Sequence, residues 1–572
     1  MTKICGAEAS RFAKTALQGF ALAHAPIVRL LPDGVMRRET PADPKVALVV
    51  GGGSGHYPAF LGYVGKGFAD AAVAGDVFAS PSTQAIIRTA RAAHQGRGII
   101  LGYGNYAGDV LNFSIAAERL NAEGIPTRLM AVSDDVASAP VARHVGRRGI
   151  AGDLSVLKIM GAAAEEGLDL DTVMAIGEKA NRRTQSLGVA FAGCTLPGET
   201  APLFTVKAGQ MAIGLGVHGE QGLEETLIPD AQALAERLCA ALLAEKPSDG
   251  SQSVAVILNG LGASKYEELF VLWTHITEIL RRHELKLVAP CVGEFITSLD
   301  MAGCSLTLTW LDTELESLWR APVISPALTR ERIEGAGLQA LTPEPAEATV
   351  PTPAATEEGR QGGRCVARVM TAIAQALAAA EVELGRIDAQ TGDGDHGQGM
   401  ARGSDAAAKT ARAAAQAGGG ARTVLAIAAD AWADRAGGTS GSLWGAGLHA
   451  FSTKLSDEKQ ATAHEMARGV MEARDVIMRL GGAKPGDKTL VDALDPLATS
   501  LAAETQEDLA AMWEKGAEAA QREAEATRLL QARRGRSRTH GERSIGHPDA
   551  GALSLALVAQ VVARSLKQRA EV

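Results

Sequence analysis

The first part of the chain alternates short apolar runs with longer amphipathic stretches. The apolar runs, each followed directly by a glycine-rich or polar segment, span residues 46–50, 98–101, 128–132 and 254–258. Continuous apolar runs of this length are typical of strands that are buried on both faces of a sheet. Stretches with helical periodicity, such as 81–93 and 110–123, separate them. This alternation predicts an α/β layer architecture, in which ligands bind at the loops after the strands.

The character of the sequence changes in the second half. Residues 341–364 are rich in Pro, Thr, Glu, Ala and Gly and lack apolar periodicity, which is typical of a linker. After Cys365 the strand-like runs disappear, and alanine-rich helical stretches cover 366–380, 422–432, 461–480, 490–503 and 509–533. We therefore predict an α/β domain over 1–335, a linker over 336–364 and an all-α domain over 365–572.

Composition narrows the class of protein. Of the 572 residues, 46% are hydrophobic and 22% are charged, and the formal net charge of −9 argues against sequence-independent nucleic-acid binding. The six cysteines form no CxxC pair and no zinc-ligand spacing, so we expect a reducing compartment. The sequence contains no run of about 18 apolar residues, so we expect no transmembrane helix. The N-terminus also lacks the apolar core of a signal peptide. We therefore expect a cytoplasmic protein with no membrane or nucleic-acid partner.

An acidic loop lies between two predicted helices of the second domain. Asp388, Asp393 and Asp395 place three carboxylates within a short segment. Such groups repel one another unless a hard cation compensates their charge. A calcium EF-hand loop requires acids at positions 1, 3 and 5, whereas here they fall at 1, 6 and 8. Magnesium completed by phosphate oxygens fits better, and the alternative is a solvated Asp-Gly turn.

Further segments of the second domain carry groups that suit phosphate binding. Residues 437–442 form a predicted loop of glycine and hydroxyl residues, but without the GKS/T ending of a Walker A motif. Residues 486–490 precede a predicted helix, and an arginine-rich stretch at 533–543 precedes Asp549. The alternatives for this basic stretch are a solvated helix end and an RNA-binding segment.

Polar side chains also follow the predicted strands of the first domain. His56 follows a glycine-rich turn, Asp109 ends the segment 104–109, and His218 lies within GLGVHGE. A lone histidine is usually structural, but three such groups at strand ends suggest a site for a polar substrate. The competing interpretation is dinucleotide binding, since residues 102–107 match G-x-G-x-x-A and Asp134 and Asp135 follow the next strand.

These residues belong to longer motifs that make a resemblance specific. GGGSGH (51–56), NYAGDVLNF (105–113), RRGIAGD (147–153), GVHGEQG (216–222), TGDGDHG and GGTSGSLWG occur in this order. With these motifs the chain resembles the single-chain, ATP-dependent dihydroxyacetone kinase family over nearly its whole length. The resemblance implies a ketose-binding domain of two α/β subdomains and an antiparallel helix barrel that binds Mg²⁺ and ATP.

The resemblance also implies roles for individual residues. His218 would bond covalently to the ketone carbonyl as a hemiaminal, Asp109 would be the general base and His56 its hydrogen-bonding helper. The substrate-binding set would be Gly53, Ser54, Gly55, His56, Gly104 and Asp109. Asp388, Asp393 and Asp395 would hold two Mg²⁺ ions. The nucleotide-binding set would be His396, Gly397, Gln398, Gly399, Thr439, Ser440, Gly481, Thr489, Leu490, Asp549, Ala550 and Gly551. Arg536 and Arg538 would belong to a lid, and the chain would form a homodimer.

The sequence departs from the family pattern beside the expected ketose site. Tyr57 and Phe60 replace polar residues, and Gly104 stands where lysine is common. Loss of that lysine removes a charge and opens room, so erythrulose and dihydroxyacetone are both candidate substrates. The family pattern DPGA is DAGA at 549–552, which affects loop stiffness more than contacts. Alternative functions are cyclisation of FAD to cyclic FMN, an NAD-dependent oxidoreductase and a non-catalytic regulator.

Overall fold

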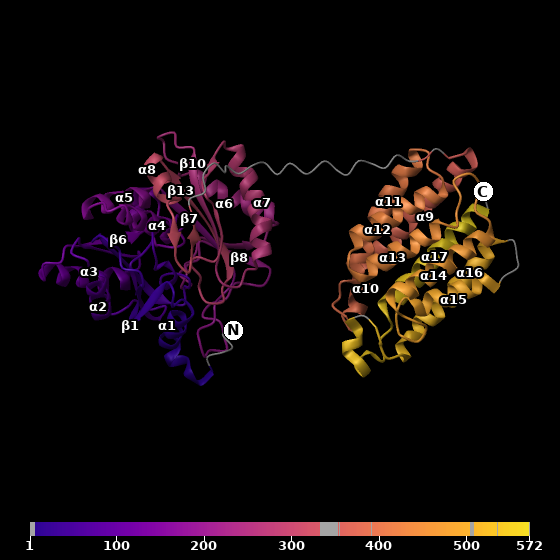
Figure 1. The fold of residues 1–572 in the computed structure, drawn as a ribbon, viewed down its shortest axis with the longest axis horizontal. Coiled ribbons are helices and arrows are strands. Elements are labelled where there is room, and N and C mark those ends of the chain that lie inside the picture. The colour runs from indigo at the N-terminus through magenta and orange to yellow at the C-terminus, as the bar shows by residue number, and fades with distance from the viewer. Residues whose placement is uncertain are drawn as a thin grey trace. The chain divides into compact units, whose positions relative to one another are not determined.

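The computed structural model describes residues 6–331, 353, 355–390, 392–503, 508–534 and 536–570. The chain divides into two compact units, Met1–Thr342 and Pro343–Val572, which we describe separately (Figure 1). Most of the predicted linker, 336–364, lies outside the described residues. The last part of this predicted linker is helical, since a helix begins at Glu357. Thr356 caps this helix, because its side chain accepts a hydrogen bond from the backbone N–H of Gly359. The helical domain therefore begins earlier than the predicted residue 365.

The first α/β subdomain is built on a six-stranded sheet with the order β1-β2-β4-β3-β5-β6. Its strands are β1 (Val28–Leu31), β2 (Gly34–Arg37), β3 (Ala47–Ser54), β4 (Ala71–Val77), β5 (Ile99–Gly104) and β6 (Thr127–Val132). Strands β4, β3, β5 and β6 pair in parallel, as the apolar runs predicted. Alternate residues of β3 face opposite cores: Val49 packs with α2 (Thr83–Ala93) and α3 (Ala107–Ala122), and Leu48 packs with α4 (Gly152–Glu165). Helices α1 (Phe12–Ala23) and α5 (Leu170–Arg182) complete this subdomain.

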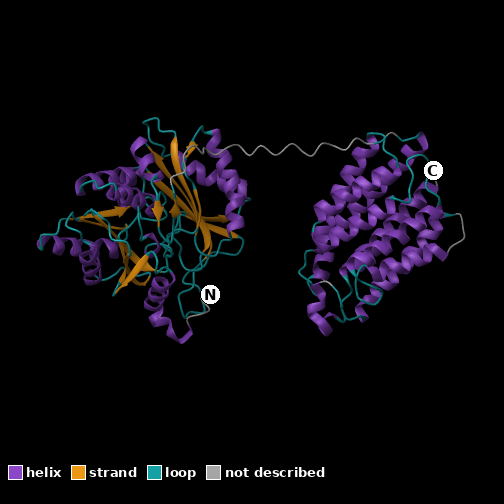
Figure 2. Cartoon of the chain, in the orientation of Figure 1, coloured by secondary structure: helices purple, strands orange, loops and turns teal. Residues whose placement is uncertain are grey.

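The second subdomain holds a seven-stranded sheet with the order β11-β10-β13-β7-β8-β9, in which β12 also pairs with β10. Its strands are β7 (Thr184–Ala192), β8 (Gln210–Ile213), β9 (Glu224–Leu227), β10 (Ser253–Gly260), β11 (Lys286–Leu287), β12 (Cys291–Gly293) and β13 (Ala302–Leu311). Helices α6 (Ala231–Leu243) and α7 (Tyr266–Arg282) share a core with this sheet. Helix α8 (Thr313–Arg320) and the ribbon of β14 (Val323–Ile324) and β15 (Thr329–Arg330) follow. Figure 2 shows both sheets within the first unit.

Helix α4 touches both sheets, which explains why it is buried on every side. It contacts β3, β5 and β6 of the first sheet and β7 and β13 of the second. The Ser155 hydroxyl lies 2.7 Å from the hydroxyl of Thr309 on β13. All residues of α4 from Gly152 to Ala164 are buried. The small residues of this helix allow two sheets to share it.

The second unit is an all-α domain whose helices close into a ring. Its helices are α9 (Glu357–Ala379), α10 (Glu381–Asp388), α11 (His396–Gln416), α12 (Ala421–Ala436), α13 (Gly438–Ser452), α14 (Ala463–Gly481), α15 (Val491–Ala503), α16 (Leu509–Ala526) and α17 (Ala550–Ala570). Consecutive helices from α11 to α17 pack on one another, and α9 packs on both α11 and α17, which closes the ring. This arrangement confirms the predicted helix barrel.

One predicted loop of this domain is wrong. Residues 437–442 were expected to form a loop, but the backbone breaks only at Gly437, and α13 already begins at Gly438. Both glycines have positive φ, +65° and +59°, which lets the chain reverse direction in very few residues. The hydroxyl residues that follow therefore lie on the first turn of a helix.

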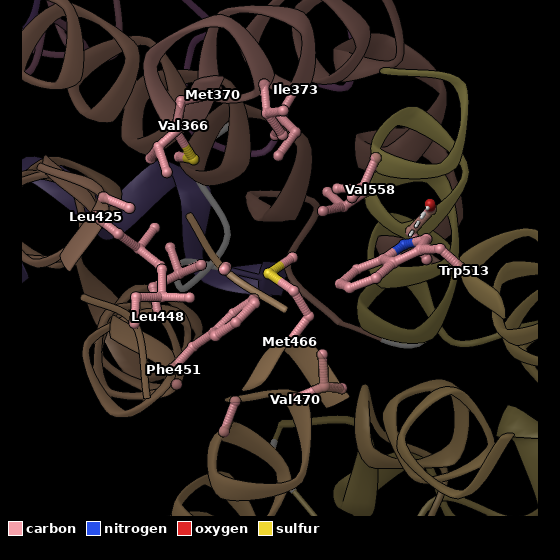
Figure 3. A pocket seen from close by; sticks show the side chains of 18 of the residues that line it. Val366, Met370, Ile373, Leu425, Leu448, Phe451, Met466, Val470, Trp513 and Val558 are labelled. Atoms are coloured by element: carbon pink, nitrogen blue, oxygen red, sulfur yellow. Dashed lines mark hydrogen bonds between the residues drawn. The ribbon is translucent and has the colours of Figure 1, made fainter. Parts of the chain in front are cut away.

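The ring encloses an apolar cavity of about 190 Å³. Figure 3 shows side chains from several helices pointing into it, among them Ile373, Phe451, Met466 and Val558. Trp513 lines the same cavity, and its indole N–H donates to the carbonyl of Ala559 at 3.0 Å. The hydrophobic core of the barrel is thus incompletely filled by its own side chains.

Helix α17 forms part of this core. Among the described residues it is the one continuous helix that is long and apolar enough to cross a membrane, over Ala550–Gln568, and half of that window is buried inside the domain. Its packing against α9 and α16 accounts for its apolar composition.

The close packing of α4 generates a stability prediction. A Cβ on Gly161 would lie 2.4 Å from the backbone oxygen of Phe68, whereas a Cβ on Gly19 of α1 would meet nothing within 4 Å. Gly161→Ala should lower the free energy of unfolding of the α/β unit by about 1–3 kcal/mol. The matched change Gly19→Ala should raise it by about 0.5–1 kcal/mol, because it lowers the entropy of the unfolded chain. Urea denaturation of both variants tests this, and equal effects would contradict it.

Candidate active site

Two histidines from different sheets meet in the first unit. His56 lies in the turn after β3, and His218 lies in the loop between β8 and β9. Their Nε2 atoms are 3.0 Å apart. The Nδ1 atom of His56 lies 2.7 Å from the carbonyl oxygen of Thr297, and the Nδ1 atom of His218 lies 2.9 Å from Oε1 of Glu220. The structure therefore brings together two of the predicted catalytic residues and gives each ring a fixed partner.

These partners determine where the protons of the two rings lie. A carbonyl and a carboxylate only accept hydrogen bonds, so both Nδ1 atoms carry a hydrogen. Two neutral rings would then face each other with lone pairs on Nε2, so the 3.0 Å contact requires one shared proton. Burial, and then the neighbouring His218, lowers the pKa of His56 to about 3, so the His56 ring does not hold the positive charge of the pair near neutral pH.

The carboxylate of Glu220 balances the positive charge that the shared proton gives to the histidine pair. Burial opposes its ionisation, but the hydrogen bond and charge of His218 outweigh burial and lower the pKa of Glu220 to about 2. Its second oxygen, Oε2, accepts from the backbone N–H of His218 at 3.0 Å. The Glu220 carboxylate thus holds both the ring and the backbone of His218 in place. Sequence reasoning gave Glu220 no role, although its position two residues after a candidate nucleophile was a usable signal.

Asp109 lies in the first turn of α3 and is 9% exposed. Its Oδ1 atom is buried without a hydrogen-bond partner among the described residues. Burial raises the pKa of Asp109 to about 6, although the Ser80 hydroxyl and the His218 charge act in the opposite direction. A carboxylate in this state is suited to accept a proton near neutral pH.

Aromatic rings that sequence reasoning missed enclose the histidine pair. Phe78 stacks on His56 with ring centroids 5.0 Å apart, and Tyr106 meets His218 edge-on at 4.8 Å. The segment 102–107, considered above for dinucleotide binding, therefore contributes a wall to the His218 site. Tyr106 belongs to the NYAGDVLNF motif, but neither it nor Phe78 was given a role, since their proximity to the histidines arises only in the fold.

The glycine-rich turn allows this close approach. A Cβ on Gly53 would lie 2.8 Å from the backbone nitrogen of Ala79, and Gly55 has a φ of +99°. The hydroxyl of Ser54 donates to the carbonyl of Gly75 at 2.6 Å, so its role here is to hold the turn. Phe60 is buried with its ring against Gly52, whereas Tyr57 is half exposed. Both aromatic residues line a separate cavity of about 340 Å³ beside the turn.

The second unit holds a polar cavity of about 470 Å³ where several helices begin or end. The carboxylates of Asp388, Asp393 and Asp395 line it, together with the predicted residues His396, Gly399, Thr439, Ser440, Gly481, Thr489, Leu490, Asp549 and Gly551. Three predicted residues do not line it. Gly397 packs against the backbone of Glu381, Gln398 is exposed, and Ala550 is buried.

The three carboxylates can offer oxygen atoms within 4.8 Å of one another. The Oδ2 atom of Asp388 also accepts from the backbone N–H of Gly394 at 2.9 Å, which orients it. An all-oxygen donor set of this charge suits a hard divalent cation such as Mg²⁺. These residues therefore fit the metal role predicted for them.

Cationic side chains, which were not assigned individually, complete the cavity lining. Arg402, Lys488 and Arg534 contribute to it. The Lys488 ammonium is held by the carbonyls of Leu530, Ser544 and His547, so it also anchors the basic segment. Arg538 is exposed, while the side chain of Arg536 lies outside the described residues, so the predicted lid role is untested.

Asp549 lies at the start of α17 and is a buried member of this lining. Burial raises its pKa to about 7, although a hydrogen bond from the Ala552 backbone at 2.7 Å opposes the shift. Its own backbone N–H donates to the Thr527 hydroxyl at 2.8 Å. The helix terminus is therefore held firmly at the edge of the cavity.

Comparison with known proteins gives a consistent result for both units. Residues 18–327 match the Dak1 domain and residues 390–564 match the DAK2 domain. The chain is 50% identical to the L-erythrulose kinase of Pectobacterium atrosepticum, over 97% of this chain and 95% of the relative. It is also 50% identical to the D-erythrulose kinase of Mycolicibacterium smegmatis, over 98% of both chains. The dihydroxyacetone kinase from C. freundii in complex with AMP-PNP and Mg²⁺ is similar in structure, with a TM-score of 0.60 and 29% identity, covering 99% of this chain and 100% of the other.

The carboxylate cluster generates a prediction for metal binding. Asp393→Asn should weaken Mn²⁺ binding at least about tenfold, because one of three clustered carboxylates loses its charge. Asp405→Asn is the matched control, since this aspartate is exposed on α11 and pairs with Lys409. Calorimetric titration with Mn²⁺ alone measures both variants. Equal affinities in the two variants would show that the cation binds elsewhere.

Proposed function

Since the chain belongs to the dihydroxyacetone kinase family, as its match to both family domains and to full-length relatives shows, we propose that it transfers the γ-phosphate of ATP to a hydroxyl of a short-chain ketose. The observation that carries the proposal is the His56–His218 contact near Asp109, whose Oδ1 atom has no hydrogen-bond partner among the described residues. This arrangement supplies a nucleophile, a proton donor and a base around one small space.

We propose that the first step bonds the ketose to His218. The shared proton moves to Nε2 of His56, and the freed lone pair on Nε2 of His218 attacks the carbonyl carbon. As the N–C bond forms, the C=O π electrons move to oxygen, which takes the proton from His56. The product is a hemiaminal on a cationic ring, and Glu220 accepts a hydrogen bond from its Nδ1–H. Glycerol has no carbonyl and cannot form this bond, so the step selects ketoses.

The transfer step then uses Asp109 as general base. Its carboxylate takes the proton of a terminal ketose hydroxyl as the hydroxyl oxygen bonds to the γ-phosphorus of ATP and ADP leaves. Asp388, Asp393 and Asp395 would hold Mg²⁺, as two ions, and these would neutralise phosphate charge. Thr439 and Ser440 at the N-terminus of α13 and Gly551 near that of α17 provide donors for phosphate oxygens.

The two proposed steps define which ketoses can react. Dihydroxyacetone and erythrulose both carry a ketone beside a terminal hydroxyl, so both fit the two steps. The similarity to relatives named L- and D-erythrulose kinase supports a four-carbon ketose as a substrate. The absence of a side chain at Gly104 is consistent with the longer substrate.

The proposal includes a cytoplasmic homodimer, as the family resemblance implies. Cys194, Cys239, Cys291 and Cys304 are buried free thiols, which supports a reducing compartment. Size-exclusion chromatography with light scattering measures the assembly directly.

A coupled ADP-release assay tests the function. The chain should release ADP with dihydroxyacetone and with at least one erythrulose enantiomer in the presence of Mg²⁺, and glycerol should be inactive. His218→Asn should reduce kcat/KM for ketoses at least about 100-fold, because it cannot form the covalent bond. Ketose labelled with ¹³C at the carbonyl should show a protein-bound tetrahedral carbon signal, distinct from that of the free hydrate, only with intact His218. Full turnover by this variant would refute covalent attachment.

The acid limb of the pH profile reports on Asp109. The base acts as a carboxylate, so protonation below its pKa of about 6 should reduce kcat about tenfold for each pH unit. Asp109→Asn should abolish turnover at every pH while the ¹³C signal of attached ketose persists. Retention of turnover with an unchanged acid limb would assign the base to another group.

A further inference from the structure

Asp153 is a second acidic side chain near this site that no step above uses. It lies in the first turn of α4 and is 0% exposed. Neither of its carboxyl oxygens has a hydrogen-bond partner among the residues that the structure describes. A buried carboxyl group without partners costs stability, so its presence calls for a ligand that completes its hydrogen bonds.

The neighbouring Asp134 shows what a structural carboxylate looks like in the same place. Asp134 is equally buried, but its two oxygens accept from the backbone N–H groups of Ile150 at 2.8 Å and Gly152 at 2.7 Å. The charged groups that act on Asp153 are Asp134 and Asp109, both acidic. Burial and these two carboxylates raise the pKa of Asp153 well above its usual range, which favours the acid form that can both donate and accept.

Gly104 connects Asp153 to the histidine pair. A Cβ at Gly104 would lie 3.3 Å from Oδ2 of Asp153 and 3.5 Å from the Cε2 atom of Tyr106. The Tyr106 ring in turn meets His218 edge-on. A side chain at position 104 would therefore stand between Asp153 and the loop that carries Tyr106. Glycine leaves only backbone there.

Taken with the proposed function, on which this step rests, the geometry points to Asp153 as the residue that selects a four-carbon ketose by hydrogen bonding to its additional hydroxyl. Asp109 removes the proton of the hydroxyl that is phosphorylated, whereas Asp153 forms a hydrogen bond with the hydroxyl that dihydroxyacetone lacks. Asp153 is thus a specificity residue, and because position 104 is glycine, no side chain of that residue separates its carboxyl group from Tyr106.

The test compares two substrates in each of several variants. The quantity measured is the ratio of kcat/KM for the preferred erythrulose enantiomer to kcat/KM for dihydroxyacetone. Asp153→Ala should lower this ratio about 10- to 100-fold, as expected for loss of one hydrogen bond to a carboxyl group. Asp153→Asn keeps a hydrogen-bonding group and should lower it less. Gly104→Ala places a methyl group at the gap and should also lower the ratio, which provides a second measurement if Asp153→Ala fails to fold.

Asp70→Asn is the matched control. Asp70 is a buried carboxylate of the same unit that pairs with Arg37 and Lys45, so its replacement should change both substrates by the same factor and leave the ratio unchanged. If no ketose supports ADP release by the unmodified chain, the proposed function itself fails. If ketoses are turned over but Asp153→Ala and Gly104→Ala leave the ratio unaltered, the role of Asp153 is refuted.

Discussion

The contact between the Nε2 atoms of His56 and His218 is the interaction on which the first unit's site depends. It joins a turn of one sheet to a loop of the other, and it is secured from behind by the segment 297–299. The backbone N–H of Thr297 donates to the carbonyl of His56 at 3.2 Å, and the Ser298 hydroxyl donates to the carbonyl of Val217. Because both rings are also fixed at Nδ1, their Nε2 atoms are held facing each other.

The same unit concentrates buried groups whose hydrogen-bonding capacity is unused. Oδ1 of Asp109, both oxygens of Asp153 and the hydroxyl of Tyr106 are all buried without partners in the described part of the chain. Other buried polar groups of this unit have partners, such as the Lys158 ammonium, which donates to the backbone carbonyls of Leu318 and Ala321. Outside the site, the buried side-chain atoms without partners in the described part of this unit are ring or guanidinium nitrogens of Arg37, His94 and Arg330. The free-energy cost of removing the unpartnered groups of the site from water is already met during folding. A substrate hydroxyl can therefore bond to them without that cost, which means that such groups are preorganised for binding.

The helical unit builds its polar cavity in a different way. Its helices are amphipathic or apolar and close around a hydrophobic interior, which leaves polar chemistry to the helix ends. Helix N-termini at His396, Gly438 and Ala550 bring backbone N–H groups to the cavity region, while Asp388 at the end of α10 contributes charge. A cavity lined by helix N-termini beside a carboxylate cluster is suited to binding phosphate groups together with a cation.

Apolar periodicity was enough to predict the two-unit organisation, the parallel core of the first sheet and the helical character of the second unit, because periodicity is a local property of the chain. Motif spacing also singled out His56, Asp109, His218 and the aspartate cluster. Folding alone makes His56 face His218, encloses the pair between Phe78 and Tyr106, and leaves Asp153 without a hydrogen-bond partner among the described residues. These facts depend on contacts between residues far apart in the chain, and on which groups folding removes from water. A pattern of neighbours along the sequence contains neither kind of information.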